Sequence, residues 1–255
     1  MAPYGEKAKQ YPGGFIDLSQ GTPVDATPKF IQEALSQASN SPSYPLTAGS
    51  AQLKDAIKNW AISTLGATGE FDVLPVIGSK EFVALLPTFL QSKKVLYPEI
   101  AYPTYLVGAL LASAQATAVG SKAADWPIAD LAWINSPANP TGQVLSDSQI
   151  SAAINWSRGN NAVIASDECY LSFSDQAKSI LALTAGDNTG ILAVHSLSKR
   201  SNMAGYRAAF VIGDRKLIDQ IRQTRKHAGL MVPAPIQQAM IAALSDNNHA
   251  KEQAK

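Results

Sequence analysis

Short apolar runs alternate with helical runs along most of this chain, and this alternation constrains the fold more than any other feature. Continuous apolar runs are typical of strands in a sheet that is covered on both faces. Alternation with helices predicts an α/β fold with a mostly parallel sheet. One helix opens with Ser146 and Gln149, the spacing of a capping box. The expected strands are 73–77, 94–97, 131–135, 162–166, 190–195 and 208–212, and the expected helices are 79–91, 146–158, 214–226 and 234–250.

The chain ahead of the first strand is less regular, beginning with an irregular N-terminal arm. A helix is expected after Thr27, because Pro28 suits the first helical position. Residues 40–49 contain two prolines and a glycine and are expected to form an ordered loop. A second helix is expected to start near Ser50 and to stop at Gly66.

The composition excludes several classes of protein. Only 16% of the 255 residues are charged against 46% hydrophobic, which rules out a disordered chain, and a net charge of +1 argues against nucleic-acid binding. The single cysteine forbids an intramolecular disulfide, and the three dispersed histidines suggest no metal site. The stretch 106–119 is shorter than the roughly 20 residues of a membrane helix. With no signal-peptide pattern at its start, the chain is expected to be a cytoplasmic globular protein.

Polar clusters follow four of the expected strands, at the place where open α/β sheets bind ligands. X-Pro bonds on both sides of Asn139 restrict its backbone. A helix start near Ser79 offers free backbone N–H groups, which attract a phosphate. The clusters are Gly78-Ser79-Lys80, the 136–142 sequence SPANPTG, Asp167-Glu168-Cys169-Tyr170, and Ser196-Leu197-Ser198-Lys199 with Arg207 eight residues later.

Each cluster alone has an ordinary explanation. The SPANPTG sequence is a good turn, Asp167 could cap a loop, and Lys199 could be a surface lysine. His195 could cap a strand end, Cys169 could be a small buried thiol, and the basic residues of 215–227 could form a solvated helix face. The functional interpretation is favoured because the clusters occur together on one edge of one sheet.

This order of clusters resembles the fold-type I pyridoxal-phosphate aminotransferases, from Gly21 to the helix beyond Pro235. Within that superfamily the chain is most similar to the actinobacterial type of succinyldiaminopimelate aminotransferase. The resemblance implies a fold-type I α/β domain with a seven-stranded, mostly parallel sheet, and pyridoxal 5′-phosphate (PLP) as cofactor. It is carried by the stretches DLSQGTPVD, LPVIGSKE, PEIAYPTY, NSPANPTG, SDECYL, AVHSLSKRSNMAGYRAAF and RKHAGLMVPAP.

The resemblance gives two residues central roles. Lys199 matches the lysine whose amine forms a Schiff base with the pyridoxal aldehyde and then moves a proton. Asp167 matches the carboxylate that faces the pyridine nitrogen. A buried negative charge there keeps the nitrogen protonated, because it favours the charged form of the base.

The other cofactor contacts of the family also have matches. Asn139 and Tyr170 match the two donors to the phenolic oxygen of the cofactor, and Tyr102 matches the aromatic residue that stacks on its ring. The residues that match the phosphate contacts are Arg207, the hydroxyls of Ser196 and Ser198, and the backbone at Ser79 and Lys80.

Two further matches concern the substrate and the partner subunit. Gly21 matches a glycine whose backbone faces the substrate, which Asn139 would also contact. Tyr44 matches a tyrosine that reaches the phosphate of the neighbouring subunit, which implies a homodimer. The alternatives are an ordinary turn glycine and a tyrosine that packs its own loop.

The resemblance also divides the chain. Residues 1–40 would form an N-terminal arm and part of a small domain, and residues 41–255 the large PLP-binding domain. Family members continue beyond this length and complete the small domain, which supplies an arginine for the substrate α-carboxylate. No residue matches that arginine, so an incomplete small domain is expected. Ala209 also departs from the family, which commonly has glycine there.

The implied reaction is amino transfer between an amino acid and a 2-oxoacid. The closest resemblance implies N-succinyl-LL-2,6-diaminopimelate and 2-oxoglutarate, in lysine biosynthesis. Two alternatives remain open: another fold-type I enzyme, such as an aspartate, alanine or kynurenine aminotransferase or a β-lyase, and a truncated, catalytically weak module that binds PLP.

Overall fold

One seven-stranded sheet organises the chain, in the order β1-β7-β6-β5-β4-β2-β3. The structure is a computed structural model that describes residues 2–16, 21 and 23–255, so part of the DLSQGTPVD stretch lies outside the described residues. β7 is antiparallel to both neighbours and the other adjacent pairs are parallel, which confirms the predicted architecture. The strands are β1 (Asp72–Ile77), β2 (Lys94–Pro98), β3 (Gln115–Val119), β4 (Leu131–Asn135), β5 (Val163–Asp167), β6 (Ile191–Ser196) and β7 (Ala208–Gly213).

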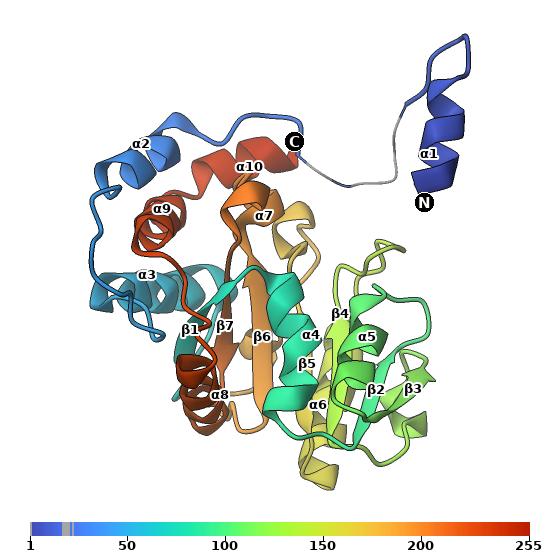
Figure 1. Cartoon of the computed structure of the whole chain (residues 1–255). Coiled ribbons are helices and arrows are strands. Elements are labelled where there is room, and N and C mark those ends of the chain that lie inside the picture. The colour runs from blue at the N-terminus through green and yellow to red at the C-terminus, as the bar shows by residue number, and fades with distance from the viewer. Residues whose placement is uncertain (1, 17–20, 22) are drawn as a thin grey trace.

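Helices cover both faces of the sheet (Figure 1). One face packs against α4 (Ser79–Phe89), α5 (Thr104–Leu111) and α8 (Arg215–His227), and the other against α2 (Lys29–Gln37), α3 (Ala51–Trp60), α6 (Asp147–Asn160) and α9 (Ala234–Ser245). Successive side chains of a strand point to opposite faces, so every strand position is apolar where both faces are covered. Each fully buried leucine or phenylalanine contributes about 1.5–3 kcal/mol.

The remaining elements are short. They are the helices α1 (Ala2–Lys9), α7 (Leu197–Arg200) and α10 (Asn248–Ala254), the π-helical turn η1 (Ala61–Leu65), and the 3₁₀ turns η2 (Ala123–Asp125), η3 (Leu171–Phe173), η4 (Ile180–Leu183) and η5 (Ala204–Tyr206). None of the described helices is both long and apolar enough to span a membrane.

The predicted helix ends depend on local capping, and most of them are confirmed. Ser50 caps α3 by accepting a hydrogen bond from the Leu53 N–H at 3.2 Å. The π-helical turn then ends at Gly66, whose φ of 71° is left-handed. Ser146 and Gln149 form the predicted capping box at the start of α6.

Three expectations were wrong. Residues 2–9 form a helix where an irregular arm was expected. The predicted helix 234–250 is broken, because the Asp246 carboxylate accepts hydrogen bonds from the N–H groups of Asn248 and His249 and starts a second helix. Arg225 is not part of a solvated face: it is fully buried, with Nη1 2.7 Å from Oε1 of Glu81.

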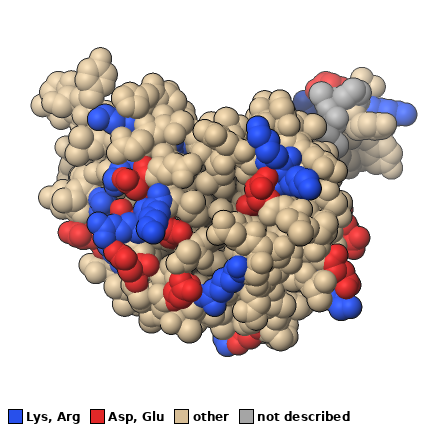
Figure 2. Space-filling model, turned by 90° about the horizontal axis from the view of Figure 1, so that it is seen from below, with Lys and Arg blue, Asp and Glu red and all other residues tan. Residues whose placement is uncertain are grey.

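Opposite charges gather around Asp72 at the start of β1. Its Oδ1 lies 3.5 Å from Nζ of Lys54 and 3.4 Å from Nζ of Lys58, and its Oδ2 lies 3.7 Å from Nη1 of Arg222. Figure 2 shows basic and acidic side chains next to one another on this side of the molecule. Burial raises the pKa of Asp72, but the N–H of Val73 and the two lysines together outweigh burial and leave it lowered.

Asp72→Asn is therefore expected to lower the free energy of unfolding at pH 7 by about 1–2 kcal/mol, because three cations lose one partly buried partner. The folded-state pKa lies below the ordinary 3.8, so this stabilisation is present above that value and lost as the pH falls through the folded-state pKa. Urea unfolding at pH 7 and pH 3 measures both effects. A difference that stays constant down to pH 3 would contradict the electrostatic explanation.

Candidate active site

The four polar clusters lie at one edge of the sheet. The parallel strands β4, β5 and β6 end there, and α7 follows β6 at the upper edge in Figure 1. β1 and β6 are both antiparallel to β7, so β1 also ends at this edge, where α4 begins. The sheet topology thus brings together clusters that are more than a hundred residues apart in the sequence.

Asp167 is buried at the end of β5 and is held by two donors. The hydroxyl of Tyr105 donates to Oδ2 at 2.8 Å, and the N–H of Cys169 donates to Oδ1 at 3.2 Å. Burial and the adjacent Asp167 charge raise the pKa of Tyr105 well above its usual range, so this phenol stays a donor. Both donors fix the direction of the carboxylate, whose oxygens are the acceptors that a protonated ring nitrogen requires. Tyr105 was not among the predicted site residues, because its only sequence signal is its place three residues after Tyr102.

The loop that carries Asn139 is organised by Asn135, another residue that the sequence analysis missed. Its Oδ1 accepts the N–H of Asn139 at 2.7 Å, and its Nδ2 donates to the carbonyls of Asp167 at 2.8 Å and Pro137 at 3.2 Å. Both the Ser136–Pro137 and Asn139–Pro140 peptide bonds are cis. One amide side chain therefore ties the Asn139 loop to the end of β5.

Lys199 lies in α7, and its side chain is partly buried. Burial lowers the pKa of its amine, the nearby Lys80 charge acts in the same direction, and Cys169 opposes them. More of this amine is therefore neutral near pH 7 than for an ordinary lysine, as a nucleophile requires. A Cβ at Gly21 would lie 3.9 Å from Nζ, which places the backbone of Gly21 next to the amine.

The residue after Lys199 anchors this turn. Arg200 is buried and donates to the Ala243 carbonyl at 3.1 Å and to Oδ1 of Asn247 at 2.5 Å. Asn247 also accepts from Nε1 of Trp60 at 3.3 Å. The α9–α10 junction thereby holds the turn that carries Lys199.

Arg207 lies against the start of α4. Its Nη1 donates to the Ala204 carbonyl at 2.9 Å, and a Cβ at Gly78 would collide with Nη2. Gly78 has a φ of 78°, so only glycine fits its conformation and the close approach together. Among the described side chains none caps α4, so the N–H groups at Ser79 and Lys80 have no side-chain acceptor, and Gly78 just before them lies against the guanidinium. This arrangement suits a phosphate.

Gly78→Ala is expected to weaken PLP binding by about ten-fold or more, because the new methyl group displaces the guanidinium and strains the backbone. Titration of the apo chain with PLP, followed by visible absorbance, measures the dissociation constant. Gly205→Ala is the matched control, since a Cβ at Gly205 meets no atom within 4 Å. Equal affinities in the two variants would contradict the phosphate role of this corner.

The remaining predicted residues surround these. The Ser196 hydroxyl accepts from the N–H of Ser198 at 3.1 Å. Burial raises the pKa of the Cys169 thiol well above its usual range, and the nearby Ser79 side chain opposes this shift. Nζ of Lys80 lies 5.7 Å from the ring centre of Tyr102.

The rings of Tyr102 and Tyr170 are close enough to Asp167 to be part of the same cluster. Tyr102 packs edge-on against Tyr105 with ring centres 5.9 Å apart. Burial raises the pKa of the Tyr170 phenol, and Cys169, Asp167 and Tyr102 add to the shift. Tyr170 and Asn139 line an open depression of about 480 Å³ together with Phe173, and Asp167, Lys199 and Arg207 are not part of its lining. Tyr44 is not part of the cluster within one chain, because it is 94% exposed.

Comparison with known proteins gives the family. A sequence model described as "Aminotransferase class I and II" matches residues 14–255. The chain belongs to this family. It is 46% identical over 256 residues to a probable aminotransferase of Mycobacterium tuberculosis, and covers 61% of that protein with 96% of its own length. It is 42% identical to the 4-dedimethylamino-4-oxo-anhydrotetracycline transaminase OxyQ of Streptomyces rimosus, and covers 73% of it with 99% of its own length.

Solved structures agree. A probable N-succinyldiaminopimelate aminotransferase from Thermus thermophilus superposes with a TM-score of 0.87 at 25% identity, over 99% of this chain and 74% of that one. The chain thus spans about three fifths to three quarters of the length of these relatives.

Aminotransferases of this family and fold depend on PLP, and the residues present fit that cofactor. A buried, doubly hydrogen-bonded carboxylate suits the ring nitrogen, and a lysine with a lowered pKa suits the aldehyde. Gly78, where any Cβ would collide with Arg207, leaves a cradle at a helix start for the phosphate.

Proposed function

We propose that this chain is the PLP-binding part of an aminotransferase, which moves an amino group from an amino acid to a 2-oxoacid. The observation that carries the proposal is the convergence of Asp167, Lys199 and Arg207 at one sheet edge, each in the surroundings that its role needs. PLP supplies a ring that accepts electrons from the carbon bearing the amino group. The protein supplies positioning, charge and proton transfer.

Each side chain has a separate task in this proposal. The Asp167 carboxylate holds a proton on the ring nitrogen, and Tyr105 fixes its direction. The amine of Lys199 binds the aldehyde and moves a proton at Nζ, which requires its neutral form. Asn139 and Tyr170 donate to the phenolic oxygen, and Tyr102 covers the ring. Arg207, Ser196 and Ser198 hold the phosphate with the backbone N–H groups of Ser79 and Lys80.

For the substrates, we propose N-succinyl-LL-2,6-diaminopimelate as amino donor and 2-oxoglutarate as acceptor, in lysine biosynthesis. The sequence resemblance and the Thermus structure support this choice. The Streptomyces relative, with its higher identity, is named as a 4-dedimethylamino-4-oxo-anhydrotetracycline transaminase, so a ring ketone is the second candidate acceptor. A free thiol in the site suits a reducing compartment, and we propose a cytoplasmic location.

We further propose a homodimer in which Tyr44 reaches the partner's phosphate site. Support comes from the exposure of Tyr44 and from the apolar outer face of α5, where Leu110 is 63% and Leu111 60% exposed. Large exposed apolar side chains on one helix mark an interaction surface. Residues 41–255 would form the large domain, since the whole sheet and nearly all site residues lie there, and residues 1–40 the arm and part of the small domain.

Half-reactions test the function without requiring full turnover. PLP-loaded chain is mixed with N-succinyl-LL-2,6-diaminopimelate, glutamate, aspartate, alanine or kynurenine, and the visible spectrum is recorded. The expected result is a loss of the visible band with the preferred donor and its return with 2-oxoglutarate. No spectral change with any donor would leave only a PLP-binding module. A response to another donor alone would replace the proposed substrate.

A further inference from the structure

A buried pair of ionisable side chains lies directly behind the candidate active site. Oε2 of Glu168 is 3.1 Å from Nε2 of His195, and the two side chains are only 1% and 5% exposed. The separation is that of an ion pair, and neither atom has a hydrogen-bond partner among the described residues. Each of the two atoms therefore depends on the other.

The rest of the pair is tightly held. Oε1 of Glu168 accepts from the Ser166 hydroxyl at 2.9 Å and from the N–H of Ile180 at 2.8 Å. The His195 ring packs edge-on against Trp60 at 5.1 Å and stacks on Phe210 at 5.6 Å between ring centres. A buried carboxylate with this set of donors is costly to disrupt, because removal of one partner leaves the others unsatisfied.

The position of the pair connects the two ends of the cofactor site. Glu168 follows Asp167 at the end of β5, and His195 precedes Ser196 at the end of β6. The N–H of Glu168 donates to the Val194 carbonyl at 2.9 Å, so the two strand ends are also joined through the backbone.

Side chains alternate between the faces of the sheet, so Asp167 and Ser196 project to the face covered by α4 and α5. Glu168 and His195 project to the opposite face, where His195 meets Trp60 of α3. The pair therefore cannot touch the cofactor and acts only through its sequence neighbours.

We propose that Glu168 and His195 are positioning residues for PLP. The pair on the back of the sheet fixes the spacing between the ends of β5 and β6, and so sets the distance between the group that holds the ring nitrogen and the group that holds the phosphate. Loss of the contact lets the two strand ends shift relative to each other, so a rigid ligand cannot satisfy both ends at once. This inference rests on the proposed function of Asp167 and Ser196.

The test compares PLP affinity in three variants of the full chain. His195→Ala removes the contact and is expected to raise the dissociation constant of PLP by about ten-fold or more, as loss of supporting residues around bound groups commonly does. His195→Gln places an amide N–H near the position of Nε2 and is expected to stay within about three-fold of the unmodified chain. Visible absorbance titration of each apo chain gives the constants.

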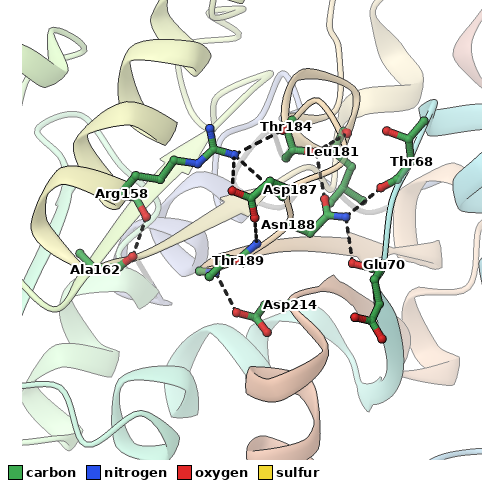
Figure 3. A network of polar contacts seen from close by, with 12 residues as sticks. Thr68, Glu70, Arg158, Ala162, Leu181, Thr184, Asp187, Asn188, Thr189 and Asp214 are labelled. Atoms are coloured by element: carbon green, nitrogen blue, oxygen red, sulfur yellow. Dashed lines mark hydrogen bonds and ion pairs between the residues drawn. The ribbon is translucent and has the colours of Figure 1, made fainter.

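Asn188→Ala is the control for general destabilisation. Asn188 is buried ahead of β6, at the opposite end of the strand from the site. It donates to the carbonyls of Thr68 at 2.8 Å and Glu70 at 3.1 Å and accepts from Thr184 (Figure 3). Asn188→Ala should lower the melting temperature, as His195→Ala does. It should leave the dissociation constant of PLP within about two-fold of that of the unmodified chain.

Three results would overturn the proposal: unchanged PLP affinity in His195→Ala, equal weakening in Asn188→Ala, or no recovery in His195→Gln. If His195→Ala does not fold, His195→Asn takes its place, because its shorter amide cannot reach Glu168. If the unmodified chain does not bind PLP, the proposed function itself is refuted. If it binds PLP and the His195 variants bind equally well, only the positioning role is refuted.

Discussion

Lys199→Ala is expected to abolish amino transfer, with a fall in kcat of at least about 10⁴-fold, and to end covalent attachment of PLP to the chain. In the proposed function the amine binds the aldehyde and also moves the proton, so one substitution would remove both functions. Lys199 combines partial burial with a lowered pKa, the combination that lets an amine act as a nucleophile near neutral pH. Borohydride reduction of the PLP-loaded chain, followed by peptide mass spectrometry, locates the attachment.

Lys178→Ala is the matched control, since Lys178 is an exposed lysine that pairs with Asp147 at the surface. This variant should keep its activity, and borohydride reduction should still attach PLP to Lys199. A label on Lys80, whose Nζ lies 5.7 Å from the ring centre of Tyr102, would contradict the assignment, as would turnover that survives Lys199→Ala.

Asp167→Ala is expected to slow amino transfer by about 10²–10³-fold, which corresponds to about 3–4 kcal/mol of lost electrostatic stabilisation. Asp167 is the residue that would hold the proton on the ring nitrogen, and alanine would supply no negative charge for that task. The substitution also removes the acceptor of the Tyr105 hydroxyl and of the Cys169 N–H. Steady-state kinetics with the preferred donor measures kcat, and PLP titration shows separately whether binding is weakened.

Tyr105→Phe tests the orientation of the Asp167 carboxylate separately from its charge. It removes one donor to Asp167 but leaves the carboxylate, so its effect on kcat should be much smaller than that of Asp167→Ala. Turnover of Asp167→Ala equal to that of the unmodified chain would refute the role of the carboxylate at the ring nitrogen. Equal losses in both variants would show that the phenol matters as much as the charge.

The strands could be predicted because the physics that selects them is local. A strand buried on both faces needs an unbroken apolar run, and the runs at 131–135 and 208–212 correspond directly to β4 and β7. The stretch 106–119 was different. It forms the end of α5 and all of β3. Both elements are rich in apolar residues, so the spacing of apolar and polar residues does not show where the helix ends and the strand begins.

Local sequence placed the four polar clusters at strand ends and helix starts, because those positions are set by neighbouring residues. The partners of those side chains became visible only in the folded chain. Tyr105 and Asp167 are 62 residues apart, Asn135 and Asp167 are 32 apart, and Arg225 pairs with Glu81 across 144 residues. Local sequence patterns determine whether a segment is a helix or a strand and where it ends. Contacts between residues far apart in the sequence depend on how the helices pack on the sheet. Burial in the packed chain then raises the pKa of the Tyr105 and Tyr170 phenols and lowers the pKa of the Lys199 amine.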